Sequence, residues 1–198
     1  MKVLLLSHTP EPEVECVWMA RTSRGKPPWA SERPSVEEAR ERLREMLRRG
    51  HYSVLEFAYM TLGFEGFTRA CLDQMRTHRH LSFMAESTRH VDMSEREVLV
   101  WEGLPTELCE EFVDFMRRLY KAAEEGAGRD VARYVLPLGV VVNWVASGNL
   151  RAWREFCEKR LRAEAHEEIR SLAAGVVKAG MSIAPVVFED LAERVKQR

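Results

Sequence analysis

The stretch from residue 77 to residue 90, THRHLSFMAESTRH, concentrates cationic and hydroxyl side chains in a chain that is otherwise close to neutral. Its two arginines are permanent cations, its three histidines are donors or further cations, and its hydroxyl groups add donors. These residues are Arg79, Arg89, His78, His80, His90, Ser82, Ser87 and Thr88. Guanidinium and hydroxyl groups suit phosphate oxygens, so the stretch predicts a phosphate or nucleotide site. A solvated basic loop would have the same composition.

The same three histidines allow a metal hypothesis. His78, His80 and His90 are of a type that ligates zinc. No HExxH spacing accompanies them. Arg79 also places a positive charge between two of the candidates. We therefore expect no metal site in this segment.

A second polar group interrupts the chain at residues 50–57, GHYSVLEF. His51, Ser53 and Glu56 supply a base, a hydroxyl and a carboxylate, so a nucleophilic Ser–His–Glu set is conceivable. No G-x-S-x-G turn supports this idea. The alternative is that these residues only cap the end of the preceding helix.

A third group lies in the segment that begins at Asn149. At about 100° per residue, a continuous helix would have two polar stripes. One stripe would hold Asn149, Phe156, Arg160 and Glu167, and the other Arg151, Glu155, Arg162 and His166. Such a helix would line a pocket or a subunit interface, or it would be a salt-bridged surface helix.

Composition limits the classes of protein to which this chain can belong. The 198 residues are 45% apolar, enough for a substantial core, and the net charge is −1. That balance gives no global sign of nucleic-acid binding, so any basic site must be local. No apolar run approaches the roughly 20 residues of a membrane helix, and the N-terminal run is too short for a signal peptide. The four cysteines, without CxxC spacing, are expected to be buried free thiols of a cytoplasmic protein.

Periodicity and turn residues predict an α+β fold in a single domain, residues 1–198, with a helix-rich C-terminal half. Strands are expected at 2–9 (buried) and 57–66, and 138–148 is either a strand or a buried helix. Residues 96–103 are either a strand or a short buried segment, and 24–34 is a loop. Helices are expected at 12–23, 34–50, 67–76, 106–126, 129–137, 149–180 and 185–195.

Two helices have especially clear sequence signals. Ser35 and Glu38 form a capping box at the start of the 34–50 helix, and Gly50 ends it. The 106–126 helix carries one apolar stripe. Its members are Leu108, Phe112, Phe115, Leu119 and Ala123.

Together, these motifs resemble those of the flavin-dependent thymidylate synthase family. The family signature begins Arg-His-Arg, then seven residues, then Ser-x-Arg; here the frame is Thr77-His78-Arg79, HLSFMAE and Ser87-Thr88-Arg89. The other matching elements, in chain order, are Ala20-Arg21-Thr22-Ser23, the His51 to Glu56 segment, Gln74, Ala132-Arg133 with Leu136-Pro137, Asn149-Leu150-Arg151, and Phe156 with Arg160. The resemblance covers most of the chain, roughly residues 1–195.

The resemblance implies a homotetramer of α+β protomers, with a twisted, mostly antiparallel sheet flanked by helices. It implies active sites where subunits meet, and reductive methylation of dUMP to dTMP. Methylenetetrahydrofolate would donate the carbon, and FAD reduced by NADPH would donate the hydride. It implies no nucleic-acid or membrane partner.

The resemblance also implies roles for individual residues. FAD would be held by Ser23, His51, Ser53, Glu56, His78, Arg79, Asn149 and Arg151. The nucleotide dUMP would be held by Gln74, Glu86, Ser87, Arg89, Arg133 and Arg160. The residues expected closest to the reaction are Arg160, Ser87 and His51, with Ser87 as a binding group and not a nucleophile. Arg160 would stabilise negative charge on the uracil ring.

The chain departs from the family pattern at a few positions. Thr77 replaces the first signature Arg, and His90 replaces the usual Tyr. Glu155 and His166 stand where Asn and Gln are common. The change at Thr77 removes one expected contact to the flavin. A relative of the same fold that binds a pyrimidine nucleotide without catalysis, or with altered specificity, is therefore the alternative.

Overall fold

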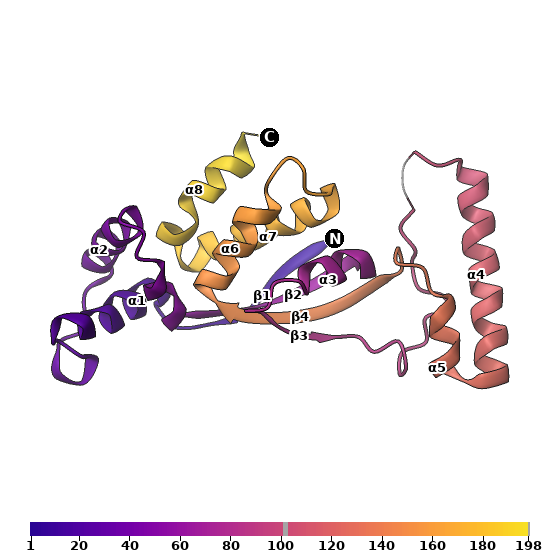
Figure 1. The fold of residues 1–198 in the computed structure, drawn as a ribbon, viewed down its shortest axis with the longest axis horizontal. Coiled ribbons are helices and arrows are strands. Elements are labelled where there is room, and N and C mark those ends of the chain that lie inside the picture. The colour runs from indigo at the N-terminus through magenta and orange to yellow at the C-terminus, as the bar shows by residue number, and fades with distance from the viewer. Residues whose placement is uncertain (101–102, 198) are drawn as a thin grey trace.

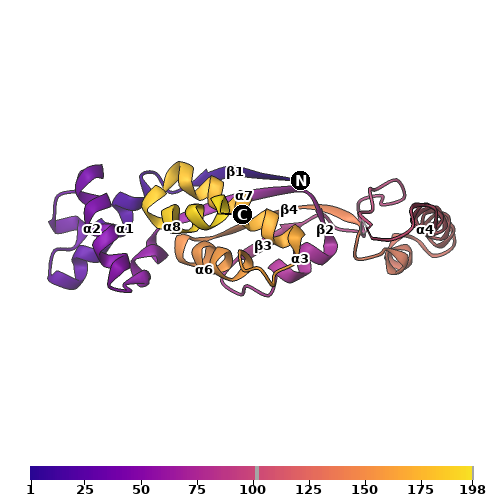
Figure 2. The ribbon, with the colours of Figure 1, turned by 90° about the horizontal axis from the view of Figure 1, so that it is seen from above.

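The computed structural model describes residues 1–100 and 103–197. A sheet lies at the centre, helices pack over one of its faces, and a helical group stands at each end (Figure 1). Seen from above, the same groups lie in a row along the long axis (Figure 2). Within residues 1–100 and 103–197, the other face of the sheet has no covering layer of helices (Figure 1).

The sheet has four strands in the order β1-β2-β4-β3, and every neighbouring pair is antiparallel. The strands are β1 (Lys2–His8), β2 (Tyr59–Thr68), β3 (Ser82–Ala85) and β4 (Val141–Asn149). The expected mostly antiparallel α+β fold is thus confirmed. The undecided segment 138–148 forms the central strand β4, as its β-branched residues favour.

Two helices follow directly from the central strands and pack on the covered face. Strand β2 continues into α3 (Arg69–Met75), which Thr68 caps by accepting a hydrogen bond from the Cys71 amide at 3.1 Å. Strand β4 continues into α6 (Leu150–Arg160), which Asn149 caps through the Ala152 amide at 2.8 Å. Side-chain oxygens at these positions satisfy amides that a first helical turn leaves free.

The predicted continuous helix over 149–180 is wrong, because the chain turns between Arg160 and Glu167. Helix α6 ends at Arg160, and α7 (Glu167–Ile183) starts a new axis. His166 caps α7 by accepting from the Glu168 amide, and Glu167 and Glu168 lie in its first turn, where the helix dipole favours negative charge. No Gly or Pro marks the turn in the sequence. The two proposed polar stripes are therefore each divided between two helices.

The last helix, α8 (Pro185–Lys196), is confirmed and packs against α6 and α7. Arg154 of α6 is buried and donates to both carboxylate oxygens of Asp190, each at 2.7 Å. The same guanidinium also donates to the Val187 carbonyl. The C-terminal helices are thus fixed to one another by a buried guanidinium whose two terminal nitrogens are hydrogen-bonded to α8.

The N-terminal group is predicted well. It comprises α1 (Pro12–Ala20), the 3-10 turns η1 (Arg21–Arg24) and η2 (Pro28–Ala30), α2 (Val36–Arg48) and η3 (Tyr52–Phe57). The Ser35 hydroxyl accepts from the Glu38 amide at 3.2 Å, and Gly50 has a φ of 78° after the helix. The Glu38 carboxylate does not complete the capping box, because it pairs with Arg21 and Arg42.

At the opposite end, α4 (Thr106–Ala127), α5 (Arg129–Ala132) and η4 (Arg133–Val135) extend away from the sheet (Figure 1). The long helix α4 is confirmed, but its apolar stripe does not face the core of the chain. Leu108, Phe112, Phe115 and Leu119 are 41–59% exposed, whereas Met116 and Tyr120 are buried. Of the expected segment 96–103, residues 101–102 lie outside the described residues, and Val98 forms only an isolated bridge with Val140.

The prediction that the first strand is buried is wrong for the single chain. Strand β1 is an edge strand paired only with β2, and Leu4, Leu5 and Leu6 are 36–52% exposed. Val3 packs against Gly175 of α7, where an added Cβ would lie 2.5 Å from a Val3 methyl group. An apolar run identifies a strand, but it does not say which of its faces the same chain covers.

The cysteines are free in the structure. Cys16, Cys71 and Cys157 are buried as expected, whereas Cys109 is only partly buried. Burial raises the pKa of the Cys16 thiol to about 12 and raises those of Cys71 and Cys157 as well. These three thiols are therefore inert packing groups. Among the described residues, no helix is long and apolar enough to cross a membrane.

Thr68 provides a test of how α3 is held. Its amide and hydroxyl both donate to Glu168 of α7, at 2.6 and 2.7 Å. Thr68→Val should lower the free energy of unfolding by about 2 kcal/mol, because it removes a cap and leaves a carboxylate without its hydroxyl donor. Urea denaturation measures this loss. Thr68→Ser keeps the oxygen and should lose less than about 1 kcal/mol; equal losses for both variants would contradict the role of the hydroxyl.

Candidate functional site

The first half of the 77–90 stretch and helix α6 form the walls of one pocket. The segment leaves the end of α3 and runs beside the C-terminal half of α6 before it enters β3. The pocket has a volume of about 280 Å³. It is lined by Thr77, His78, Arg79, His80, Leu81, Ala152, Glu155, Lys159 and Arg160.

Arg160, the last residue of α6, joins the two walls. Its Nε donates to Nε2 of His78 at 3.0 Å, and its Nη2 donates to the Thr77 hydroxyl at 2.9 Å and to the Gln74 carbonyl at 3.3 Å. Burial lowers the pKa of this guanidinium from its ordinary value, although arginine stays charged in proteins. The predicted site residues Gln74, His78 and Arg160 thus form one connected group.

His78 is held as a neutral ring. Burial, and then the positive charges of Arg160 and Lys159, lower its pKa to about 4. Because its Nε2 accepts from Arg160, the proton of the neutral ring lies on Nδ1. The ring also stands edge-on to Phe156, with centroids 4.9 Å apart. At neutral pH, His78 therefore acts as an oriented donor and not as a cation.

A chain of charged groups continues from the pocket along α6. Arg151 donates to Glu155 of the same helix at 2.9 Å and to Glu56 of η3 at 2.6 Å. With Asn149 as the cap of α6, three predicted flavin-binding positions, Glu56, Asn149 and Arg151, lie at the N-terminal part of this helix. The pair with Arg151 also gives Glu155 a counterion outside the cations that line the pocket.

The second half of the 77–90 stretch follows β3 in the chain and contacts α5. Arg89 forms a two-pronged ion pair with Asp130, with Nη2 2.9 Å from Oδ2. The Ser87 hydroxyl accepts from the Arg89 amide at 3.3 Å, and Arg133 donates to the Asp130 carbonyl at 3.2 Å. Three predicted nucleotide-binding residues, Ser87, Arg89 and Arg133, are thereby gathered around Asp130, which the sequence did not single out.

Glu86 lies between these two groups and binds the sheet. Its carboxylate accepts from the amide and the side chain of Asn143 at 3.0 and 2.9 Å, and from Arg96 at 3.2 Å. The side chain is therefore committed to β4. Its predicted role in nucleotide binding stays a prediction.

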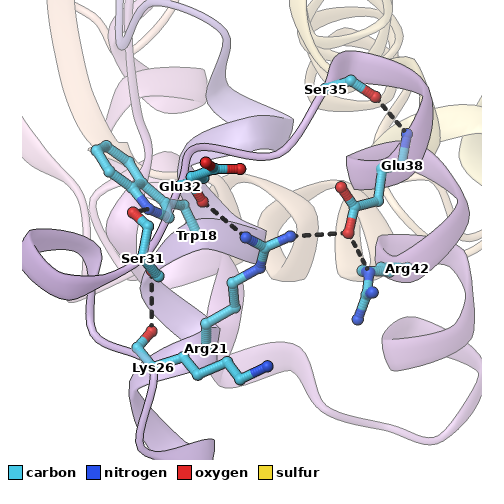
Figure 3. A network of polar contacts seen from close by, with 8 residues as sticks. All are labelled: Trp18, Arg21, Lys26, Ser31, Glu32, Ser35, Glu38 and Arg42. Carbon is cyan, nitrogen blue, oxygen red and sulfur yellow. Dashed lines mark hydrogen bonds and ion pairs between the residues drawn. The ribbon is translucent and has the colours of Figure 1, made fainter.

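The remaining predicted positions lie in the N-terminal group. Arg21 of the Ala20–Ser23 motif donates to the Glu32 carbonyl and to Glu38, both at 2.7 Å, and so anchors the loop to α2 (Figure 3). Ser23 donates to the Ala20 carbonyl at 2.9 Å. His51 lines a separate hollow beside α2, and Ser53 is exposed on η3.

Neither alternative chemistry gains support from the geometry. Within the described residues, no hydrogen bond joins His51, Ser53 and Glu56, and Glu56 instead pairs with Arg151. The described part of the chain also contains no group of His, Cys, Asp or Glu that could hold a metal ion.

Two residues of the pocket have roles that the sequence motifs do not indicate. The motif comparison marks Thr77 only as the place of an absent arginine, yet its hydroxyl donates to the Gln74 carbonyl at 2.8 Å and accepts from Arg160. Lys159 is not among the predicted site residues, although it lies four residues after Glu155, a spacing that places two residues on the same helix face.

The neutral state of His78 generates a pH prediction. Its folded pKa of about 4 lies below the ordinary 6.5, so the unfolded chain binds a proton that the folded chain does not. Stability should therefore be lost as pH falls from 6.5 towards 4. His78→Gln should lose less stability than the parent between about pH 7.5 and about pH 5, measured by urea denaturation. His80→Gln is the matched control; an identical decline in the His78 variant would exclude the effect.

Comparisons with known proteins agree with this arrangement. The family model described as thymidylate synthase complementing protein matches residues 4–186. Flavin-dependent thymidylate synthases of Mycolicibacterium gilvum and Mycobacterium tuberculosis are each 31% identical over 183 residues, which cover 82% of this chain and 73% of theirs.

The fold is also similar to solved structures. Two structures of the flavin-dependent thymidylate synthase of Helicobacter pylori, both with FAD and dUMP, have TM-scores of 0.77 and 0.79. They are 20% and 21% identical in sequence, and the match covers 96% of this chain and 99% of theirs. At this identity, the likeness concerns the fold. The family match and the mycobacterial relatives together establish that this chain belongs to the flavin-dependent thymidylate synthase family.

Proposed function

We propose that this protein methylates dUMP reductively to dTMP, with methylenetetrahydrofolate as carbon donor and NADPH-reduced FAD as hydride source. The observation that carries the proposal is the positively charged pocket between residues 77–81 and α6, at the family's signature positions. A relative of the same fold, from Helicobacter pylori, has been solved with FAD and dUMP. We place the reaction in the cytoplasm.

The residues of the pocket fit a flavin dinucleotide. Arg79 and Lys159 offer cations to a diphosphate, and neutral His78 offers an oriented N–H group. Asn149, Arg151 and Glu56 extend the polar surface along the start of α6. When bound and reduced, FAD supplies the hydride for the reaction. Ser23, His51 and Ser53 would contribute from the N-terminal group, His51 beside the flavin ring and the folate.

Arg160 is suited to stabilise charge on the substrate. Hydride addition places negative charge on the uracil ring and its carbonyl oxygens, and a fixed guanidinium lowers the energy of that state. Arg160 is partly buried and already oriented by Thr77, His78 and Gln74, so little reorganisation is required. Desolvation strengthens its electrostatic effect.

The cluster around Asp130 is suited to the phosphate of dUMP. Arg89, Ser87 and Arg133 provide charge and hydroxyl groups for this anion. Asp130 now occupies two of the donors of Arg89, and so it competes with an incoming phosphate. Glu86 and Gln74 would complete the nucleotide site from the ends of β3 and α3.

We also propose that the protein assembles as a homotetramer. Leu108, Phe112, Phe115 and Leu119 of α4 and Leu4, Leu5 and Leu6 of β1 are exposed, and grouped exposed apolar side chains mark interaction surfaces. The pocket of about 280 Å³ is at the lower limit for a small-molecule site and cannot enclose a dinucleotide alone. Neighbouring protomers would cover these surfaces and complete the site.

The catalytic proposal predicts a yellow protein. After addition of FAD and desalting, the chain should retain the visible flavin bands and form dTMP from dUMP. Arg160→Ala should lower kcat/KM by about 100-fold or more, because a preorganised charge is lost. Arg162→Ala, an exposed arginine two positions further, should retain activity. A colourless protein that still binds dUMP would instead favour a non-catalytic relative.

The Asp130 cluster predicts opposite effects of two substitutions. Arg89→Ala should weaken dUMP binding at least tenfold, because a charge-assisted contact to phosphate is lost. Asp130→Asn should strengthen binding, because a carboxylate that competes for Arg89 is removed. Isothermal titration measures both. Arg69→Ala, which breaks a comparable surface pair with Asp73, is the control. Unchanged dUMP affinity in Arg89→Ala would place the phosphate elsewhere.

A further inference from the structure

Lys159 projects from the last turn of α6 and lines the pocket opposite residues 77–81. The side chain belongs to an exposed residue. Among the described residues, it forms no ion pair or hydrogen bond, unlike most cations of α6. Arg151 is paired with Glu56 and Glu155, and Arg154 with Asp190. Lys159 is therefore a cation at a pocket without a protein counterion.

The charges around this pocket do not balance. Arg79, on the opposite wall, also has no ion-pair partner within the described residues. The carboxylate of Glu155 accepts from Arg151, and the guanidinium of Arg160 is oriented by neutral acceptors. Two free cations thus face a shared space from two segments. Two cations on opposite walls attract an anionic ligand that presents oxygen atoms to each wall.

The residue at position 77, on the wall opposite Lys159, carries no charge. The family signature has an arginine there, and this chain has a hydroxyl that is already engaged in two hydrogen bonds. The hydroxyl holds Arg160 and the end of α3, so Thr77 is a scaffold residue. Arg76, the preceding residue, points to Asp73 at 3.7 Å. The charge that the segment lacks is available from α6 across the pocket.

We propose that Lys159 binds a phosphate group of the ligand in this pocket, together with Arg79, and supplies the positive charge that Thr77 lacks. This inference rests on the proposed function. The phosphate belongs either to the flavin diphosphate or to the nucleotide monophosphate, which present the same oxygens. Lys159 also contributes, after burial and Arg160, to the lowered pKa of His78, so its charge does reach into the pocket.

Charge substitutions at position 159 test the inference by binding alone. Lys159→Ala should weaken the phosphate-bearing ligand about tenfold, Lys159→Glu should weaken it further, and Lys159→Arg should retain it. Lys178→Ala, an exposed lysine on α7, is the matched control. Flavin fluorescence titration compares FAD with riboflavin, and isothermal titration compares dUMP with deoxyuridine. Circular dichroism checks that each variant is folded.

The ligand pairs identify the source of the phosphate. Weaker FAD with unchanged riboflavin would assign Lys159 to the flavin diphosphate. Weaker dUMP with unchanged deoxyuridine would assign it to the nucleotide. Equal affinities in Lys159→Ala and Lys178→Ala, or equal losses with and without phosphate, would overturn the inference and leave the proposed function intact. A parent chain that binds neither FAD nor dUMP would overturn both.

Discussion

The guanidinium of Arg160 is the contact on which the site depends. It connects the end of α6 to a segment 82 residues earlier, where one donor group fixes a ring nitrogen, a hydroxyl and a backbone carbonyl. Burial lowers the pKa of His78 first, and the charge of Arg160 lowers it further, while the same guanidinium donates to the Thr77 hydroxyl. It also keeps a permanent cation partly desolvated beside the pocket, where its field is stronger than in water. Arg160 alone thus provides three polar contacts between the two walls of the pocket.

The sheet makes this contact possible. Strands β2 and β4 are antiparallel neighbours, and each continues directly into a helix that returns over the same face. Helix α3 therefore starts at one end of the sheet and α6 at the other, and their C-terminal ends meet between them (Figure 1). The end of a helix carries partial negative charge on free carbonyls. Arg160 of α6 donates to the Gln74 carbonyl in the last turn of α3. The same guanidinium therefore both caps α3 and places a positive charge at the pocket.

The sequence predicted the positions of helices and strands better than it predicted which of their faces are buried. Ser35 and Pro185 are local signals, and each marks the start of its helix correctly, whereas the β-branched run of β4 left a strand and a buried helix both open. The turn after Arg160 is invisible to such signals, because His166 caps α7 without Gly or Pro. The leucines of β1 and the stripe of α4 have the right period, but exposure depends on what packs against them. In the site, signature motifs located Arg79 and Arg89, whereas the pairing of Asp130 with Arg89 and the place of Lys159 at the pocket are seen in the folded chain.

Position 77 shows why a motif departure must be judged in its surroundings. An arginine there would stand beside Arg79, Lys159 and Arg160, and among the described residues no carboxylate pairs with any of these three. Threonine carries no charge, and its hydroxyl accepts a hydrogen bond from Arg160 at 2.9 Å. Lys159 lies on the opposite wall of the same pocket. If it binds the phosphate of the ligand as proposed, the substitution moves one positive charge of the pocket from the 77–81 segment to α6 and keeps the binding site.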